Sequence, residues 1–227
     1  MIEVKELTKI YGKKDAAFKA LDNVSLVIEN KSTVSIIGKS GSGKSTLMHI
    51  MSGLDEPTNG TVVIDDVDIF KMKEKKIDSF RSSEMSFVFQ SFFVEANATC
   101  YQNVMLPLEI AKIGITKRKK MVMEALKAVD LQDKVNAKAS TLSGGQKQRL
   151  AVARAIVNKP SILFADEPTG NLDSTNGDKI IDLLFGLNKS LGCTLIIVTH
   201  DPDIAKKTSM RISIKDGKIE GIEKGPK

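Results

Sequence analysis

A glycine-rich stretch near the N-terminus carries the residue types needed to hold phosphate. Positions 38–46 read GKSGSGKST, which matches the phosphate-loop pattern G-x-x-x-x-G-K-S/T in full. Glycines have no Cβ, so the backbone can bend and bring several N–H groups close to phosphate oxygens. Lys44 adds a positive charge at the β- and γ-phosphates, and the Ser45 hydroxyl is a hard oxygen ligand for Mg²⁺. The residues predicted to bind the nucleotide here are Gly38, Ser40, Gly41, Gly43, Lys44, Ser45 and Thr46.

The segments on either side support this interpretation. The β-branched run 33–37 predicts a strand, and residues 45–51 have the apolar spacing of a helix. A strand, a glycine-rich loop and a helix in this order place the positive end of the helix at a bound phosphate. The alternative, a flexible Gly/Ser turn, does not explain a full match in this context. The sequence therefore predicts a binding site for a nucleoside triphosphate.

Three further predicted strands also end in polar residues. Gln90 follows the apolar run 85–89, Asp166 and Glu167 follow 162–165, and His200 follows 194–199. Ligands of open α/β sheets bind at the carboxyl ends of the strands, so we expect these side chains to face one nucleotide. We assign Asp166 and Gln90 as Mg²⁺ ligands together with the P-loop serine. Glu167 is the expected base for the attacking water, and Lys44, Gln90 and His200 are the other expected catalytic residues.

Each of these residues also has a plain structural interpretation. The acid pair could cap a helix that begins at Pro168, and His200 could cap the end of a strand. Tyr11, at the end of the first predicted strand, could stack on adenine or pack in the core. Their joint occurrence beside a phosphate loop favours the catalytic interpretation.

A second anion site is indicated at positions 142–146, which read LSGGQ. Ser143 can cap the following helix, and Gly144 and Gly145 leave backbone N–H groups uncovered at the positive end of that helix. A capped helix in a flexible loop does not explain why both glycines lie at its start. Because this site is distant in sequence from the phosphate loop, we predict that it contacts a γ-phosphate held elsewhere. We expect Ser143, Gly144, Gly145 and Gln146 to bind nucleotide.

The order of predicted elements indicates an α/β protein. Strands at 2–11, 19–29 and 61–64, the last after an Asn59-Gly60 turn, predict an antiparallel layer, and continuous apolar runs such as 194–199 predict a parallel sheet. Helical patterns at 77–83, 102–131 (interrupted near 114–116), 144–157 and 176–191 and a hairpin around Asp216-Gly217 complete the chain. We predict a P-loop NTPase with a RecA-like core of mostly parallel sheet (1–91 and 159–227), an N-terminal antiparallel β layer and an inserted α-helical lobe (92–158) that carries LSGGQ.

Composition excludes several other classes of protein. The 227-residue chain is 41% hydrophobic, but no apolar run reaches the ~18 residues that span a bilayer, which favours a soluble protein. Two cysteines without a C-x-x-C pattern favour free thiols in a reducing cytosol, and two histidines make a zinc site improbable. The net charge of +6 with 5% aromatic residues gives little support to nucleic-acid binding.

With these motifs in hand, the chain resembles an ABC-type ATPase subunit over essentially its whole length. The resemblance identifies Tyr11 as the A-loop residue, Gln90 as the Q-loop, 142–146 as the signature and 162–167 as Walker B. It also identifies 170–173 as the D-loop, with Asp173 at the nucleotide, and His200 as the H-switch. The runs FVFQSF (87–92) and DEPTGNLD (166–173) are most similar to the macrolide-exporter and lipoprotein-release group, MacB-like and LolD-like.

The resemblance implies a function in membrane transport. It implies ATP and Mg²⁺ as cofactors and two copies packed head to tail around two ATP, with each ATP between one phosphate loop and the partner's signature. A cytoplasmic subunit of this kind is peripheral on the cell membrane through a permease, which we expect to dock near Gln90 and the apolar loop 92–94. Export or extraction of peptides, lipoproteins or drugs is the expected work. The alternative is regulation of an extracytoplasmic cell-wall enzyme through an FtsX-type membrane protein. A soluble ABC protein of translation or DNA repair is disfavoured by the single cassette, and a P-loop kinase has no need of LSGGQ.

Overall fold

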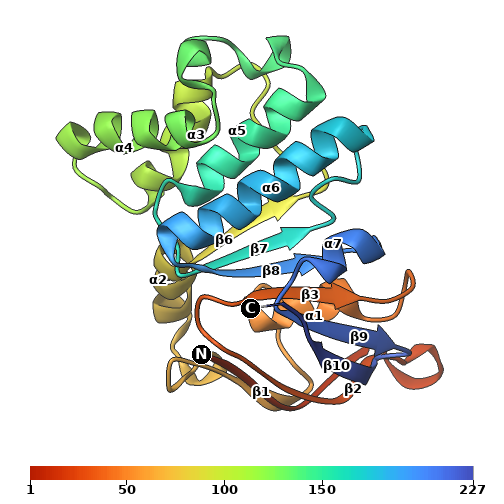
Figure 1. The fold of residues 1–227 in the computed structure, drawn as a ribbon. Coiled ribbons are helices and arrows are strands. Elements are labelled where there is room, and N and C mark those ends of the chain that lie inside the picture. Colours follow the sequence, from red (N-terminus) through yellow and green to blue (C-terminus); the bar gives the residue numbers. More distant parts are fainter. Residues whose placement is uncertain (227) are drawn as a thin grey trace. The chain divides into compact units, whose positions relative to one another are not determined.

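A computed structural model describes residues 1–226 (Figure 1). The chain divides into two compact units, each described by itself below. Unit 1 consists of Met1–Arg81 and Thr194–Lys227, and unit 2 consists of Ser82–Cys193. Among the described residues, no helix combines the length and the apolar character required to cross a membrane.

Unit 1 contains an antiparallel sheet with the strand order β2-β1-β4-β5. Its core face is built by period-2 alternation of apolar residues, for example in β2, where Val24, Leu26 and Ile28 are buried. Register shifts along β1 and β2 mark bulges between Val4 and Ile10. The strands are β1 (Ile2–Tyr11), β2 (Phe18–Ile28), β4 (Asn59–Ile64) and β5 (Val67–Asp68).

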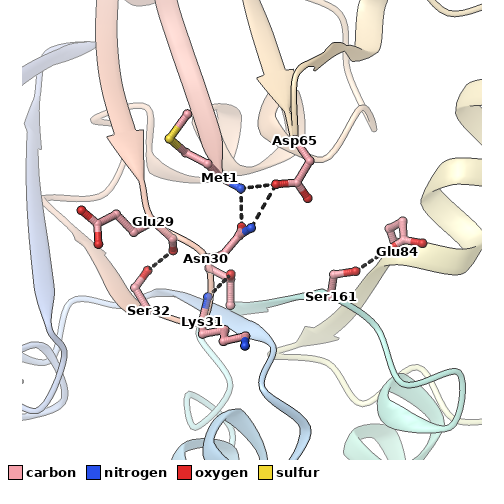
Figure 2. A network of polar contacts seen from close by, with 9 residues as sticks. Met1, Glu29, Asn30, Lys31, Ser32, Asp65, Glu84 and Ser161 are labelled. Atoms are coloured by element: carbon pink, nitrogen blue, oxygen red, sulfur yellow. Dashed lines mark hydrogen bonds and ion pairs between the residues drawn. The ribbon is translucent and has the colours of Figure 1, made fainter.

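A network at the start of the chain holds one end of this sheet together (Figure 2). The amino group of Met1 donates hydrogen bonds to Asn30 and Asp65, and the Asn30 amide donates to Asp65 at 3.0 Å. These residues lie at the start of β1, after β2 and after β4. Hydrogen bonds from the N-terminal ammonium and from Asn30 lower the pKa of the Asp65 carboxyl, since both favour its charged form.

Unit 1 also contains β3 (Thr33–Ile37), which pairs in parallel with β8 (Thr194–Val198) on one side and with β9 (Met210–Lys215) on the other. All five residues of β8 are buried, as expected for a parallel strand covered on both faces. Strand β10 (Lys218–Lys224) pairs antiparallel with β9 through a hairpin. Helix α1 (Lys44–Met51) contacts β1, β2 and β8, and the short helix α7 (Pro202–Lys206) contacts β3.

Unit 2 combines two parallel strands with a group of helices. Strands β6 (Met85–Phe89) and β7 (Ile162–Asp166) pair in register, and helix α5 (Gly144–Ile156) packs against β6 and against α3, α4 and α6. The same arrangement is visible in Figure 1, where α5 lies alongside α6. The other helices of unit 2 are α3 (Cys100–Ile110), α4 (Ile115–Ala128) and α6 (Ser174–Leu191), with single-turn 3-10 helices at Gln132–Lys134 and Ala139–Thr141. Unit 1 has single-turn 3-10 helices at Lys14–Ala16 and Ile69–Lys71, and α2 (Glu74–Glu84) includes the point at which the chain passes from unit 1 to unit 2.

Local sequence explains where the helices of unit 2 begin and end. Capping boxes start both α3, at Thr99 and Gln102, and α5, at Ser143 and Gln146. Helix α6 ends at Gly192, whose backbone is left-handed with φ of 67°.

The predicted strands and helices are confirmed to within a few residues, with three corrections. Asn59 and Gly60 belong to β4 and not to a turn before it. Asn59 pairs with Thr8 of β1, and Gly60 lies between this pair and the next one, Thr61 with Lys5. Two short elements, β5 and α7, were not predicted; β5 is only two residues long and α7 only five, too short for a periodic pattern. No helix begins at Pro168, which lies in a turn, and α6 is capped six residues beyond Glu167 by Asp173. The capping interpretation of the acid pair is therefore wrong.

Candidate functional site: a phosphate loop and a signature helix

The phosphate loop of unit 1 follows β3 and leads directly into α1. Gly43 is the N-cap of α1 with φ of 105°, in a region that residues with a side chain rarely adopt. A Cβ on Gly43 would lie 2.5 Å from the Ala20 carbonyl oxygen of β2 and 3.0 Å from a methyl carbon of Leu21. Glycine is therefore required here both for backbone conformation and for close packing.

The lysine of the loop is held beneath it. The Lys44 ammonium donates hydrogen bonds of 2.9 Å to the carbonyl oxygens of Gly38 and Lys39, and only 8% of the residue is exposed. A charge that is fixed by the loop's own carbonyls is positioned before any phosphate arrives. Ser45 and Thr46 follow in the first turn of α1, where backbone N–H groups and the helix dipole favour an anion.

A hairpin distant in sequence supports the loop. The Gly217 N–H donates to the Ser42 carbonyl at 3.0 Å, and the Gly217 carbonyl accepts from the Asp22 N–H at 2.9 Å. The turn between β9 and β10 therefore links the phosphate loop to β2. The Asp216-Gly217 pattern predicts this hairpin but not its contact with the loop, because nothing local signals a contact between residues 42 and 217.

Tyr11 lies at the end of β1, beside the start of α1. Its hydroxyl donates to the Asp55 carboxylate at 2.5 Å and also forms a hydrogen bond with Thr46, and the Lys9 ammonium lies 4.8 Å from the ring centre. Burial and the neighbouring Asp55 raise the pKa of the Tyr11 hydroxyl. Because 40% of Tyr11 is exposed, the core-packing interpretation is wrong. Lys9 and Asp55, which orient the ring, carry no motif and were missed.

His200 lies in unit 1 with the phosphate loop. It follows Thr199, whose N–H donates to the Ile36 carbonyl at 3.2 Å and so continues the pairing of β8 with β3. The two parallel strands therefore deliver His200 and the phosphate loop at the same edge of their sheet.

Unit 2 brings Gln90 and the acid pair together in the same way. Phe89 pairs with Asp166 at the ends of β6 and β7, so Gln90 and Glu167 leave neighbouring strands side by side. Asp166 and Glu167 are half-buried, and Glu167 has a positive φ of 46°. A non-glycine residue in that region marks a turn held by its surroundings.

The D-loop packs against this pair. The Asn171 amide donates to the Gln90 carbonyl at 3.0 Å, and the Gly170 N–H donates to the Glu167 carbonyl at 3.0 Å. A Cβ on Gly170 would lie 2.7 Å from the Gln90 amide nitrogen. The sequence places Asn171 in the D-loop motif but does not predict its contact with Gln90, which depends on tertiary structure.

The signature lies beside the D-loop at the start of α5. The Ser143 hydroxyl accepts from the Gln146 N–H at 3.3 Å, and the Gln146 side chain accepts from the Ser143 N–H at 3.0 Å. The predicted helix cap is therefore confirmed, and it uses the Gln146 side chain as well. A Cβ on Gly145 would lie 3.0 Å from the Asn176 side-chain oxygen, and one on Gly144 would lie 3.7 Å from Leu172.

An open groove lies on unit 2 between the segment after β6 and helix α3. Arg154 donates hydrogen bonds to the carbonyl oxygens of Phe93 at 2.5 Å and Phe92 at 3.3 Å, and burial lowers the pKa of its guanidinium. Asn103 accepts from the Glu95 N–H and donates to the Glu95 carbonyl at 3.0 Å. The groove is thus preformed. Its apolar lining comes from Phe93, Val94, Ala98, Met105 and Leu106.

Comparisons with known proteins agree with these motifs. The protein family described as "ABC transporter" matches residues 21–170. The ATP-binding protein LolD of the lipoprotein-releasing system of Leptospira interrogans is 42% identical over 223 residues, which cover 98% of this chain and 92% of that protein. The uncharacterized ABC transporter ATP-binding protein YvrO of Bacillus subtilis is 41% identical and covers 99% of this chain and 98% of its own.

A solved structure is similar over the full length. The ATP-binding cassette MJ0796 of Methanocaldococcus jannaschii, in a dimeric post-hydrolysis state bound to ADP and Pi, has a TM-score of 0.90 at 41% identity. The similarity covers 100% of both chains. This chain belongs to the ABC transporter family, as an ATP-binding cassette that hydrolyses ATP. The predicted fold class is confirmed with it.

Proposed function

We propose that this chain is the ATPase subunit of a membrane transporter and that it works as a head-to-tail dimer. The observation that carries the proposal is the start of helix α5 in unit 2. There the capped helix α5 begins with two small residues, Gly144 and Gly145, beside the D-loop. A helix start with uncovered N–H groups suits a γ-phosphate. The relative MJ0796 is dimeric in its solved structure, which supports a second copy as the source of that phosphate.

The proposed reaction is in-line attack of water on the γ-phosphorus. Glu167 accepts a proton from the water as the new P–O bond forms, and the bond between the γ-phosphorus and the bridging oxygen breaks to release ADP. Lys44 stabilises the charge that develops on the phosphates, and His200 orients the γ-phosphate. Tyr11 stacks on the adenine, which agrees with its exposed ring beside α1.

The remaining ligands of the nucleotide follow from the same motifs. Gly38, Ser40, Gly41, Gly43 and Thr46 hold phosphate, and Gln146 and Asp173 of the partner complete the shared site. Ser45, Asp166 and Gln90 supply hydroxyl, carboxylate and amide oxygens, a set of hard donors that fits Mg²⁺. When bound, the cation would neutralise charge on the β- and γ-phosphates.

The membrane partner is proposed to dock in the groove beside α3. Phe93 is 67% exposed and Leu106 is 49% exposed, and both line the groove. Exposed apolar side chains around a preformed groove favour a protein partner. The similarity to LolD proteins over nearly the whole chain supports a permease of the lipoprotein-release type, with export or extraction as its work and a peripheral location on the cytoplasmic face of the membrane.

The shared site is tested with two inactive variants. Lys44→Ala disables the phosphate loop, and Ser143→Arg disables the signature. Each variant alone has no intact composite site, whereas a mixed dimer has one. An equal mixture should therefore regain up to about a quarter of the wild-type sites, because half of randomly paired dimers are mixed.

Thermal unfolding of each variant first establishes that both chains fold. A mixture that is no more active than either variant alone would show that each chain completes its own site. The dimer proposal would then be wrong, while the ATPase assignment would stand.

A further inference from the structure

A buried glutamine on the signature helix contacts the two segments that carry the catalytic side chains. Gln148 is 0% exposed, and its side-chain amide nitrogen donates to the carbonyl oxygens of Phe89 at 3.1 Å and Pro168 at 2.6 Å. Phe89 immediately precedes Gln90, and Pro168 immediately follows Glu167. One side chain of α5 therefore links the ends of both strands.

The orientation of this amide follows from its surroundings. A flipped amide would place its oxygen against two carbonyl oxygens, which repel it, so the NH₂ group must face them. In this orientation the side-chain oxygen of Gln148 is buried without a hydrogen-bond partner among residues 1–226. An unpaired buried oxygen is unfavourable, and an apolar side chain of the same shape would avoid it. The glutamine is thus suited to donating its two hydrogen bonds and not to packing alone.

The two contacted segments are also joined to each other by a hydrogen bond. Asn171 joins the D-loop to the Gln90 carbonyl, and the Gly170 N–H donates to the Glu167 carbonyl. Glu167 itself has a positive φ, which only surrounding contacts can hold in place. The amide of Gln148 ties both segments by hydrogen bonds to the helix that starts with the signature.

We propose that Gln148 is a positioning residue, which keeps Gln90 and Glu167 in register with the signature helix. A shift of α5 when its start engages a phosphate is transmitted through the two carbonyls to both side chains. The proposal rests on the function proposed above, in which Glu167 is the base. It adds a residue that touches neither nucleotide nor metal.

The first test is Gln148→Met, which keeps the length of the side chain and removes both donors. We expect kcat for ATP hydrolysis to fall about 10- to 100-fold, since small displacements of a catalytic group have effects of this size. Binding of a fluorescent ATP analogue should change less than about twofold, because the phosphate loop is untouched. Val152→Ala is the matched control: it removes buried packing volume from the same helix, at a side chain that has no hydrogen-bond donor for either carbonyl. It should lower thermal stability and leave kcat unchanged at a temperature well below the unfolding midpoint.

A double-variant comparison separates positioning from a general structural defect. In a Glu167→Gln background, followed by single-turnover hydrolysis over hours, Gln148→Met should cause a smaller fold-loss than in the wild type, because the part of its effect that operates through Glu167 is already lost and only the part through Gln90 remains. An equal fold-loss in both backgrounds would overturn the proposal, and so would an unchanged kcat for Gln148→Met alone. If Glu167→Gln alone hydrolyses ATP at a near-normal rate, Glu167 is not the base and the proposed function is wrong in that respect. The Gln148 variants do not affect this result, so the two failures can be told apart.

Discussion

Replacing Gly43 by alanine is expected to lower the free energy of unfolding by about 3 kcal/mol. The positive φ of 105° costs an alanine about 2 kcal/mol of backbone strain. The new Cβ would meet the Ala20 carbonyl oxygen at 2.5 Å, and the displacement of backbone this forces costs about 2 kcal/mol more. A less flexible unfolded chain offsets about 0.7 kcal/mol of the total.

Gly41 provides a matched control in the same loop. Its φ is 77°, but a Cβ there would have no atom within 4 Å. Gly41→Ala therefore carries the strain without the clash, and we expect a loss of about 1 kcal/mol. Gly186 in α6 is exposed, has no such φ and also has open space around a Cβ, so Gly186→Ala should stabilise the chain by about 0.5–1 kcal/mol.

Guanidinium unfolding of the nucleotide-free chain, followed by far-UV circular dichroism, measures all three changes. Circular dichroism is preferred because the chain contains no tryptophan. In a thermal scan, Gly43→Ala should lower the midpoint by about 6–12 °C, given 2–4 °C per kcal/mol for a chain of this size. Equal losses at Gly41 and Gly43 would contradict the predicted clash, because they would show that the close approach of β2 to the loop has no energetic effect.

Two further predictions concern the groove and the N-terminal network. Phe93→Asn introduces a residue that tolerates the positive φ of 47° and removes the exposed ring, so it should reduce capture of a polytopic membrane protein from detergent extracts. The control is Ile115→Asn, at an apolar position that is 80% exposed and lies outside the groove, and it should not reduce capture. Equal capture by both variants would contradict the proposed docking site. The pKa of Asp65 is lower in the folded chain than in the unfolded one, so its contribution is present above pH ~4 and is lost as the pH falls through the folded value. Because its side chain is 60% exposed, Asp65→Asn should cost only a few tenths of a kcal/mol at pH 7 and less as the pH falls below ~4, and a difference that grows on acidification would contradict this sign.

Sequence alone predicted the parts of the site that obey local rules. The phosphate loop, the capped signature helix and the polar residues after the strands all depend on residue type over a few neighbouring positions. For the same reason β3 and β6 were predicted with their observed bounds, since short apolar runs between polar residues leave little freedom in assigning a strand.

Contacts between distant segments were decided only by the tertiary structure. The support of the phosphate loop by Gly217 joins residues 42 and 217, and the link from Gln148 to the carbonyls of Phe89 and Pro168 joins three separate elements. Backbone carbonyls carry no sequence signature, so no pattern predicts which side chain binds them. Residue types and spacing thus determined which chemistry this protein performs, whereas packing decided which residues hold the reacting groups in place.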